Sequence, residues 1–251
     1  MTTRVKTPAE IVSMKESGRQ LATVLQYLKQ NIAAGMSTKQ IANLASEKLQ
    51  SLGGKPAFLG YYGFPDVICI SINDEVVHGI PSENRIIKKG DIVSLDFGVK
   101  VNGMITDAAI SVVIGDKTNS AKQKLVDITE AALFAGIETI HDGVHVGTIA
   151  NAIETVLNKH KYGIVRDLVG HGVGHELHEE PNIPNYGRAN TGMKLKAGMT
   201  IAVEPMATLQ GYKVYTDSDG WTIKTVDKSL AAHFEHTILV TETGYEILTA
   251  L

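Results

Sequence analysis

Residues 91–107 read DIVSLDFGVKVNGMITD, and this stretch decides the fold of the chain. Its Asn-Gly pair at 102–103 is the strongest short hairpin signal, because both central residues of a type I′ turn adopt positive φ. With these two residues as the turn, Asp96 and Asp107 lie on one face of the sheet as diagonal neighbours, about 7–8 Å apart at the backbone. The residue pairs expected from this register are Val101–Met104, Gly98–Asp107 and Asp96–Ala109.

Two carboxylates that converge on a sheet face repel each other unless one is protonated or a cation lies between them. Two unrelated rim aspartates would give the same pattern, so the hairpin alone leaves the choice open. Further residues of the ligand type lie downstream: His171 in GHGVGHELHEEP, Glu204 in IAVEPM and Glu235 in HFEHTILV. A charged acid within an apolar strand is unfavourable unless it has a partner.

Taken together, four carboxylates and one imidazole suit a pair of divalent cations bridged by carboxylates. This oxygen-rich set accepts manganese or iron as well as zinc or cobalt, so it does not select the metal.

The composition is that of a globular chain with no sign of a nucleic-acid or membrane partner. The 251 residues suit one large domain or two small ones, and the 43% apolar fraction provides for a sizeable core. A net charge of −3 gives no electrostatic footprint for nucleic acid. No apolar run approaches the roughly 20 residues of a membrane span. The opening MTTRVKTPAEI resembles no signal peptide, and the lone Cys69 has no internal disulfide partner, so we expect a cytoplasmic protein.

The spacing of apolar residues predicts two helices at the start of the chain, over 8–32 and from a capping sequence at 37–40 to Leu52. Thr7-Pro8 provides an N-cap and a proline at the first helical position. Two further helices are expected over 120–140 and 146–161. Loops are expected over 55–65 and 74–81, and strands over 67–73, 199–206, 212–217, 222–226 and 233–241.

A weak internal repeat relates the two halves of the chain. IKKGDIVSLD at 87–96 resembles LKAGMTIAVE at 195–204, and each segment follows a predicted pair of helices. Any strand that follows a Lys-Gly turn would resemble these segments in part. In both copies, however, the acid lies six residues after the glycine. We therefore expect one domain, residues 1–251, built from two pseudo-symmetric halves in which Asp96 and Glu204 are equivalent.

The histidines near residue 175 allow another type of site. His175-Glu176-Leu177-His178 is HExH and not HExxH, and the glycines around it oppose a helix, which excludes the zinc-protease helix. A mononuclear site of His171, His175 and His178 is conceivable. It leaves the strand carboxylates unexplained, so the dinuclear interpretation is favoured.

Several longer motifs resemble those of the bacterial type I methionine aminopeptidases: GYYGFPDVICISINDEVVHGIP, DIVSLDFG with TD eleven residues on, GHGVGHELHEEPNIPNYG, IAVEPM and FEHTILVT. The resemblance covers nearly the whole chain. It implies the α/β (α+β) pita-bread fold shared with creatinase and prolidase: two duplicated half-domains with a curved, mostly antiparallel sheet covered by helices. It also implies hydrolysis of the N-terminal methionine from nascent proteins and peptides, with a preference for a small second residue.

The same resemblance assigns the ligands of two divalent metal ions, which are Co, Mn, Fe or Zn. It implies that Asp96 chelates one metal, that His171 and Glu204 bind the other, and that Asp107 and Glu235 bridge both. Glu204 is then also the expected general base for the attacking water.

For the substrate, the resemblance implies that His78 and His178 contact the region of the scissile peptide, His178 by stabilising the oxyanion. It implies a methionine pocket that includes Tyr61, Phe64, Cys69, Leu177 and Trp221. Phe58 stands where a smaller cysteine can occur in the family, and Leu177 where phenylalanine can, so the shape of the pocket is in question. Without the resemblance, Cys69 and Trp221 could equally be ordinary core residues.

The expected partners are the N-termini of nascent polypeptides, and the ribosome is a candidate place for that encounter. The family implies a monomer that binds neither nucleic acid nor membrane. Two rivals remain on the same fold. One is a peptidase that acts before proline, although such relatives usually carry a large extra N-terminal domain, and the other is a binding module, although such relatives lose metal ligands.

Overall fold

A long β-hairpin lies at the centre of the computed structural model, which describes residues 5–115 and 121–250. Its strands are β4 (Ile92–Val101) and β5 (Met104–Val113), and the pairs Val101–Met104, Gly98–Asp107 and Asp96–Ala109 confirm the predicted register. Asn102 and Gly103 have φ values of 49° and 86°, as a type I′ turn requires. The hairpin register therefore follows from two turn residues.

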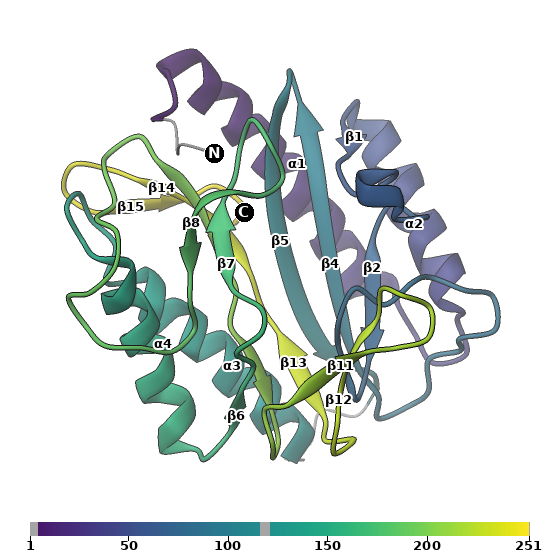
Figure 1. The fold of residues 1–251 in the computed structure, drawn as a ribbon. Helices are drawn as coiled ribbons and strands as arrows, with labels where there is room; N and C mark the ends of the chain where they lie inside the picture. Colours follow the sequence, from purple (N-terminus) through teal and green to yellow (C-terminus); the bar gives the residue numbers. More distant parts are fainter. Residues whose placement is uncertain (1–4, 116–120, 251) are drawn as a thin grey trace.

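The first sheet is built around β4, which pairs with β5 along one edge. Its other edge pairs with β1 (Lys55–Pro56) and β2 (Cys69–Ile72) at different points along its length. The helices α1 (Pro8–Asn31) and α2 (Thr38–Leu52) belong to this half, and α1 lies behind the long hairpin in Figure 1. Buried leucines and valines of α1 pack with the buried apolar residues of β4, so hairpin and helices share one core.

Both N-terminal helices begin where the sequence predicts. Thr7 and Glu10 form a capping box at the start of α1, with Pro8 at its first position. Ser37 and Gln40 form a second capping box before α2. In the part of the chain that the structure describes, no helix has the length and apolar composition needed to cross a membrane.

The second half repeats the order of a helix pair followed by a sheet. The helices α3 (Ala121–Ile137) and α4 (Val146–Lys159) come first. The sheet has the order β15-β14-β9-β7-β8, and its strands are β7 (Gly170–Gly172), β8 (Glu179–Ile183), β9 (Thr200–Val203), β14 (His236–Val240) and β15 (Tyr245–Ile247). Leu133, Ile137, Ile149 and Ile153 of the two helices pack with Ile201 and Val203 in a separate core.

Within the described residues, two smaller sheets complete the fold, each with three strands. One has the order β13-β10-β6 and the other the order β11-β12-β3. Their bounds are β3 (Glu75–Val77), β6 (Gly163–Ile164), β10 (Met206–Thr208), β11 (Val214–Thr216), β12 (Ile223–Thr225) and β13 (Ala231–His233).

Several predicted boundaries were wrong. The expected loop at 74–81 contains β3, and the loop at 55–65 contains β1 and the 3₁₀ turn η1 (Tyr61–Gly63). The expected strand at 199–206 is divided into β9 and β10, because Pro205 has no N–H to donate to a ladder. The expected strand at 233–241 is likewise divided into β13 and β14. At both breaks the chain passes between the same two sheets.

The two halves are joined next to these breaks. The backbone N–H of Ala109 donates to the carbonyl of Glu235 at 3.2 Å, and the N–H of Glu235 donates back to Ala109 at 2.9 Å. Beside this bridge, the hydroxyl of Thr237 donates to the carbonyl of Asp107 and accepts from its N–H, at 2.8 and 2.9 Å. These bonds bring the first sheet and the second sheet together at two predicted ligands.

We expect Gly18→Ala to lower the free energy of unfolding by about 1–3 kcal/mol, although alanine normally stabilises a helix by about 1 kcal/mol relative to glycine. Gly18 lies in α1, and a Cβ there would come within 2.0 Å of the carbonyl oxygen of Leu248. The matched control is the exposed Gln26→Ala in the same helix. Urea unfolding measures both variants, and a Gly18→Ala protein more stable than wild type would contradict this packing.

Candidate metal centre

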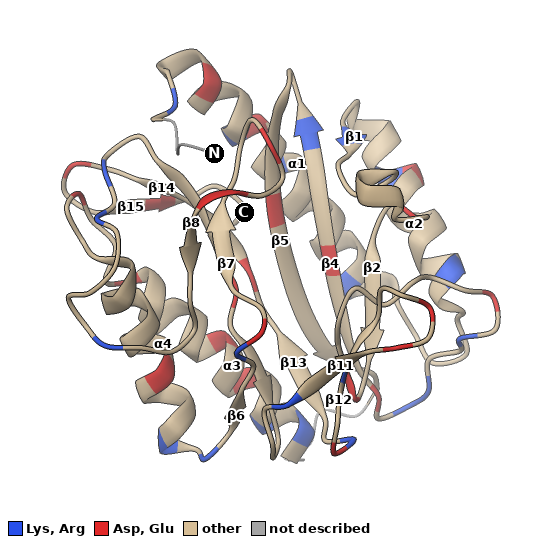
Figure 2. Cartoon of the chain, viewed as in Figure 1, with Lys and Arg blue, Asp and Glu red and all other residues tan. Residues whose placement is uncertain are grey.

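The predicted metal ligands come from both halves of the molecule and meet in one cavity. Asp96 lies in the middle of β4, Asp107 on β5 and His171 on β7. Glu204 and Glu235 occupy the two breaks, after β9 and after β13. Figure 2 shows acidic bands within β4 and β5, facing the acidic segments of the other half. The hairpin therefore supplies two acids, and the sheet crossings supply the other two.

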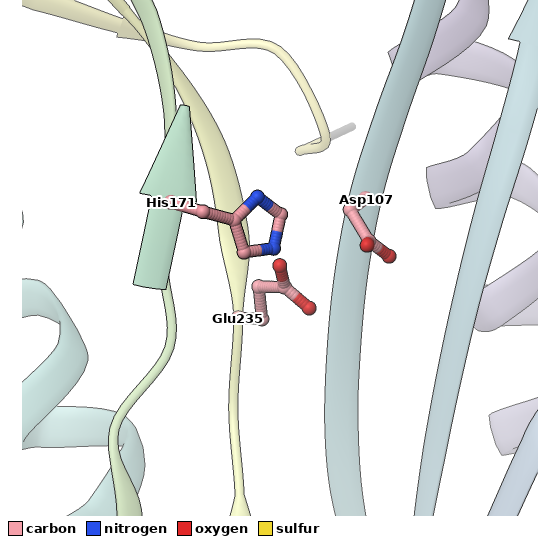
Figure 3. Close-up of side chains that lie close together, drawn as sticks. All are labelled: Asp107, His171 and Glu235. Carbon is pink, nitrogen blue, oxygen red and sulfur yellow. The ribbon is translucent and has the colours of Figure 1, made fainter. Parts of the chain in front are cut away.

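Three of these side chains converge closely enough to share one ion. Asp107, His171 and Glu235 each offer a ligand atom, and these atoms lie within 4.8 Å of one another (Figure 3). Glu204 stands beside them, with its Oε1 3.4 Å from Nε2 of His171. All three residues of the cluster are buried, so their charges are poorly solvated.

Unpaired oxygens show that the cluster fits a cation. Among the described residues, Oδ1 of Asp96, Oδ1 of Asp107 and Oε1 of Glu235 are buried without a hydrogen-bond partner. Buried polar atoms are nearly always paired, and unpaired ones call for an explanation such as an ion. Nδ1 of His171 contacts the carbonyl of Gly172 at 2.9 Å, and as its donor it leaves the Nε2 lone pair for a metal.

Burial and mutual repulsion set the protonation of the acids. Burial, and then the charge of Asp107, raises the pKa of Asp96 well above its usual value. Burial raises the pKa of Asp107 to about 7. Burial, and then neighbouring carboxylates, raises the pKa values of Glu204 and Glu235 well above normal. A divalent cation reverses this balance, because it stabilises the ionised carboxylates.

An apolar wall, formed by aromatic and aliphatic side chains, lines the same cavity as the acids, and the cavity has a volume of about 340 Å³. That is near the lower end of the roughly 300–1,000 Å³ range of ligand pockets. The rings of Phe64 and Trp221 meet edge to face at 5.2 Å. The cavity is lined by all the residues predicted for the methionine pocket: Tyr61, Phe64, Cys69, Leu177 and Trp221.

Phe58 also lines this cavity, and it is one of the two residues that put the shape of the pocket in question in the sequence. Its ring lies over Gly98 of β4, where a Cβ would come within 2.6 Å of Phe58 Cε1. It also meets Phe64 edge to face at 6.5 Å. The glycine in the strand therefore provides the space that the larger residue at 58 needs.

The two predicted substrate-contacting histidines border the same cavity. His78 adopts a positive φ of 61°, and burial lowers its pKa to about 4. Arg85 holds its loop by donating hydrogen bonds to the carbonyls of Ile80 and Ile70 and by pairing with Glu75. A non-glycine residue at positive φ persists where its surroundings fix it, and such residues cluster at functional sites.

His178 lies beside a predicted metal ligand, and His78 lies beside the aromatic residues. The ring centroid of His178 is 4.2 Å from that of His171, and the ring centroid of His78 is 6.5 Å from that of Trp221. Burial lowers the pKa of His178, so its ring is neutral near pH 7. A neutral imidazole at this place can donate one hydrogen bond into the cavity.

The alternative site of three histidines is wrong. Nε2 of His175 lies 2.7 Å from Oε1 of Glu10 at the start of α1, and its backbone N–H donates to Glu179 at 2.7 Å. Glu179 also pairs with Lys6 at 2.6 Å. His175 thus ties the N-terminal segment to the loop that carries His178, and it does not line the cavity with His171.

One residue near the cluster was missed in the sequence. His233 is buried, and its Nε2 lies 3.5 Å from Oε2 of Glu204. Burial lowers its pKa to about 3. It precedes Glu235 by two positions in an apolar run, and the two-residue period of a strand could have placed both on one face. Glu204 therefore lies between the imidazoles of His171 and His233.

A comparison with known families agrees with this geometry. The model of metallopeptidase family M24 matches residues 12–242. The chain belongs to metallopeptidase family M24. Membership implies that the protein binds divalent metal, in agreement with the buried cluster of carboxylates and histidine.

Individual relatives are similar over almost their whole length. The chain is 44% identical to methionine aminopeptidase 1 of Bacillus subtilis, over 97% of this chain and 98% of that protein. It is 42% identical to methionine aminopeptidase of Clostridium acetobutylicum, with 98% of each covered.

Solved structures agree with this fold. The crystal structure of methionine aminopeptidase from Thermotoga maritima superimposes with a TM-score of 0.97 at 43% identity, covering both chains fully. Prolidase from Pyrococcus furiosus has a TM-score of 0.78 at 24% identity, and the match covers 98% of this chain and 65% of that one. The second likeness concerns the fold alone. The pita-bread architecture expected from the sequence is confirmed.

We expect the metal-free protein to lose stability as the pH rises above about 6.5, the usual pKa of histidine. The raised pKa values mean that the folded state holds carboxyl protons that the unfolded state has released. Each such proton lowers the free energy of unfolding by about 1.4 kcal/mol per pH unit. Below this pH the buried histidines, whose pKa values are lowered, oppose the trend because they bind protons only after unfolding.

Urea unfolding of the chelated protein between about pH 6.5 and about pH 8.5 measures this slope. Asp107→Asn removes the group whose pKa is about 7 and should give a shallower slope. Added Mn²⁺ should reverse the sign for wild type, because metal binding displaces the protons. A stability that is level or rising with pH in the chelated wild type would show that the acids are not held protonated.

Proposed function

We propose that the protein is a metalloaminopeptidase that hydrolyses the peptide bond after an N-terminal methionine. One observation carries this proposal: a carboxylate-histidine cluster and a group of aromatic and apolar side chains line a single cavity. The similarity to methionine aminopeptidases over nearly the full chain supports the same activity. The chain would act as one catalytic domain of two related halves.

The proposed ligands are the residues that the sequence predicted, and they would hold two divalent cations: Asp96, Asp107, His171, Glu204 and Glu235. Such cations supply Lewis acidity, which polarises a carbonyl and lowers the pKa of water. The unpaired oxygens of Asp96, Asp107 and Glu235 support this occupancy. Co, Mn, Fe and Zn all remain compatible with the donor set.

Glu204 is the proposed general base. Its side chain lines the cavity and is 13% exposed, so it is largely shielded from bulk water. Its two oxygens are flanked by His171 and His233, at 3.4 and 3.5 Å. It would accept the proton of the attacking water and later return one to the leaving amine, as a positioned carboxylate can.

His178 and His78 are the proposed contacts to the scissile peptide. A neutral His178 would donate a hydrogen bond to the oxygen on which negative charge develops. His78 is held by a fixed loop at the same cavity and would orient the peptide. Both roles depend on a fixed orientation of the imidazole ring, and neither requires the ring to carry a charge.

The apolar wall gives the proposed selectivity for methionine. Phe64, Trp221 and Tyr61 surround a narrow space that suits an unbranched chain, and sulfur makes favourable contacts with ring edges. The physiological substrates would be the N-termini of nascent polypeptides with a small second residue, met in the cytoplasm by a monomer. The ribosome is the proposed place of this encounter.

The decisive assay uses the peptide Met-Ala-Ser and protein stripped of metal by a chelator. Mn²⁺, Co²⁺, Fe²⁺ and Zn²⁺ are added back singly, and free methionine is measured. We expect metal-dependent release from this peptide and none from its N-acetylated form. If the metal-loaded protein instead cleaves only peptides with proline in second place, the fold is used as in the prolidases and the proposed specificity is wrong.

We expect His178→Ala to lower kcat by roughly 10²-fold, the usual effect of removing one donor to a developing oxyanion. Metal content should stay unchanged, because His178 is not a proposed ligand. His141→Ala, an exposed histidine after α3, is the control and should retain the wild-type rate. Loss of bound metal in His178→Ala would show that this residue is a ligand.

A further inference from the structure

The hydroxyl group of Tyr61 makes a contact that a pocket wall does not require. Its oxygen lies 2.8 Å from Nδ1 of His178, a residue 117 positions further along the chain. The two ring centroids are 5.4 Å apart. A phenylalanine at this position would form the same apolar wall, so the hydroxyl has its role toward His178.

Tyr61 is presented by a tight and well-bonded turn. Gly60, Tyr62 and Gly63 all adopt positive φ, at 83°, 46° and 89°. The N–H of Gly60 donates to the carbonyl of Phe64, and the N–H of Phe64 donates to the carbonyl of Tyr61, both at 2.9 Å. The ring of Tyr62 packs against Tyr61 at 4.7 Å. The backbone that carries Tyr61 is therefore held by hydrogen bonds, and its ring has a neighbour in Tyr62.

The direction of this hydrogen bond follows from the donor and acceptor properties of the Tyr61 hydroxyl and the His178 ring. Burial raises the pKa of Tyr61, so the hydroxyl keeps its proton. Within residues 5–115 and 121–250, His178 is the hydrogen-bond partner of this hydroxyl. The phenolic O–H is the stronger donor of the pair and the unprotonated imidazole nitrogen is the stronger acceptor, so the O–H donates to Nδ1.

We propose that Tyr61 is a positioning residue that fixes the tautomer of His178. The hydroxyl donates to Nδ1, so the neutral imidazole carries its hydrogen on Nε2, the nitrogen left to act as a donor. The ring of His171, at 4.2 Å, packs against His178 and limits its rotation. The tautomer itself follows from this contact, and its catalytic consequence rests on the proposed hydrolysis.

The tautomer can be measured without any assay of activity. Long-range nitrogen-15 spectra of histidine-labelled protein, loaded with diamagnetic Zn²⁺, distinguish Nδ1–H from Nε2–H in a neutral ring. At about pH 8, above the usual histidine pKa of about 6.5, the ring of His178 is neutral. Its signals among the nine histidines are assigned by their loss in His178→Ala.

We expect Nε2–H in wild type and a mixture of both tautomers in Tyr61→Phe. Tyr62→Phe is the matched control, because it removes one hydroxyl from the same turn without touching the bond to His178, and it should keep Nε2–H. An unchanged tautomer in Tyr61→Phe would overturn the proposal. So would Nδ1–H in wild type.

Kinetics test the consequence for catalysis. Tyr61→Phe should lower kcat about tenfold on Met-Ala-Ser, the effect of losing one orienting hydrogen bond, with KM within about twofold because the aromatic wall remains. In the His178→Ala background the same substitution should have no further effect. An equal loss in both backgrounds would show that Tyr61 does not act through His178. If wild type releases no methionine, the proposed function is wrong, and the spectra still decide the tautomer.

Discussion

The rest of the structure depends on one electrostatic constraint, the crowding of four largely buried acids around one cavity. Asp96, Asp107 and Glu235 are buried, and Glu204 is nearly so. Their ionised forms repel one another and are poorly solvated, so the folded protein must either keep protons on them or bind cations. The unpaired oxygens of the cluster favour cations. The apolar cores of the two halves provide the free energy that holds this arrangement together.

The fold brings the acids together through the joint between its halves. The paired hydrogen bonds of Ala109 with Glu235, and those of Thr237 with Asp107, connect β5 to the other sheet at the ligands themselves. The acids and the hydrogen bonds that position them therefore lie in the same short segments of the chain. A change that separates the halves would also separate the ligands, so stability and metal binding depend on a shared set of contacts.

The sequence predicted what local rules control. The Asn-Gly turn determined the register of the hairpin and thus the neighbours Asp96 and Asp107, and the apolar strands around Glu204 and Glu235 marked those acids as unusual. It did not predict that both strands break at these acids, because the switch between sheets is a tertiary event. His233 and the Tyr61–His178 bond were missed for the same reason, since each depends on segments that are distant in sequence.

The bond between Tyr61 and His178 connects recognition to chemistry within the cavity. The ring of Tyr61 forms part of the wall that would receive the methionine side chain, and its hydroxyl holds the proposed oxyanion donor. A side chain that fills the pocket leaves this ring in place, whereas one that is too wide must push it, and with it the hydrogen bond to Nδ1. Selection by the pocket would then act on kcat as well as on binding, because a displaced ring also releases the tautomer of His178.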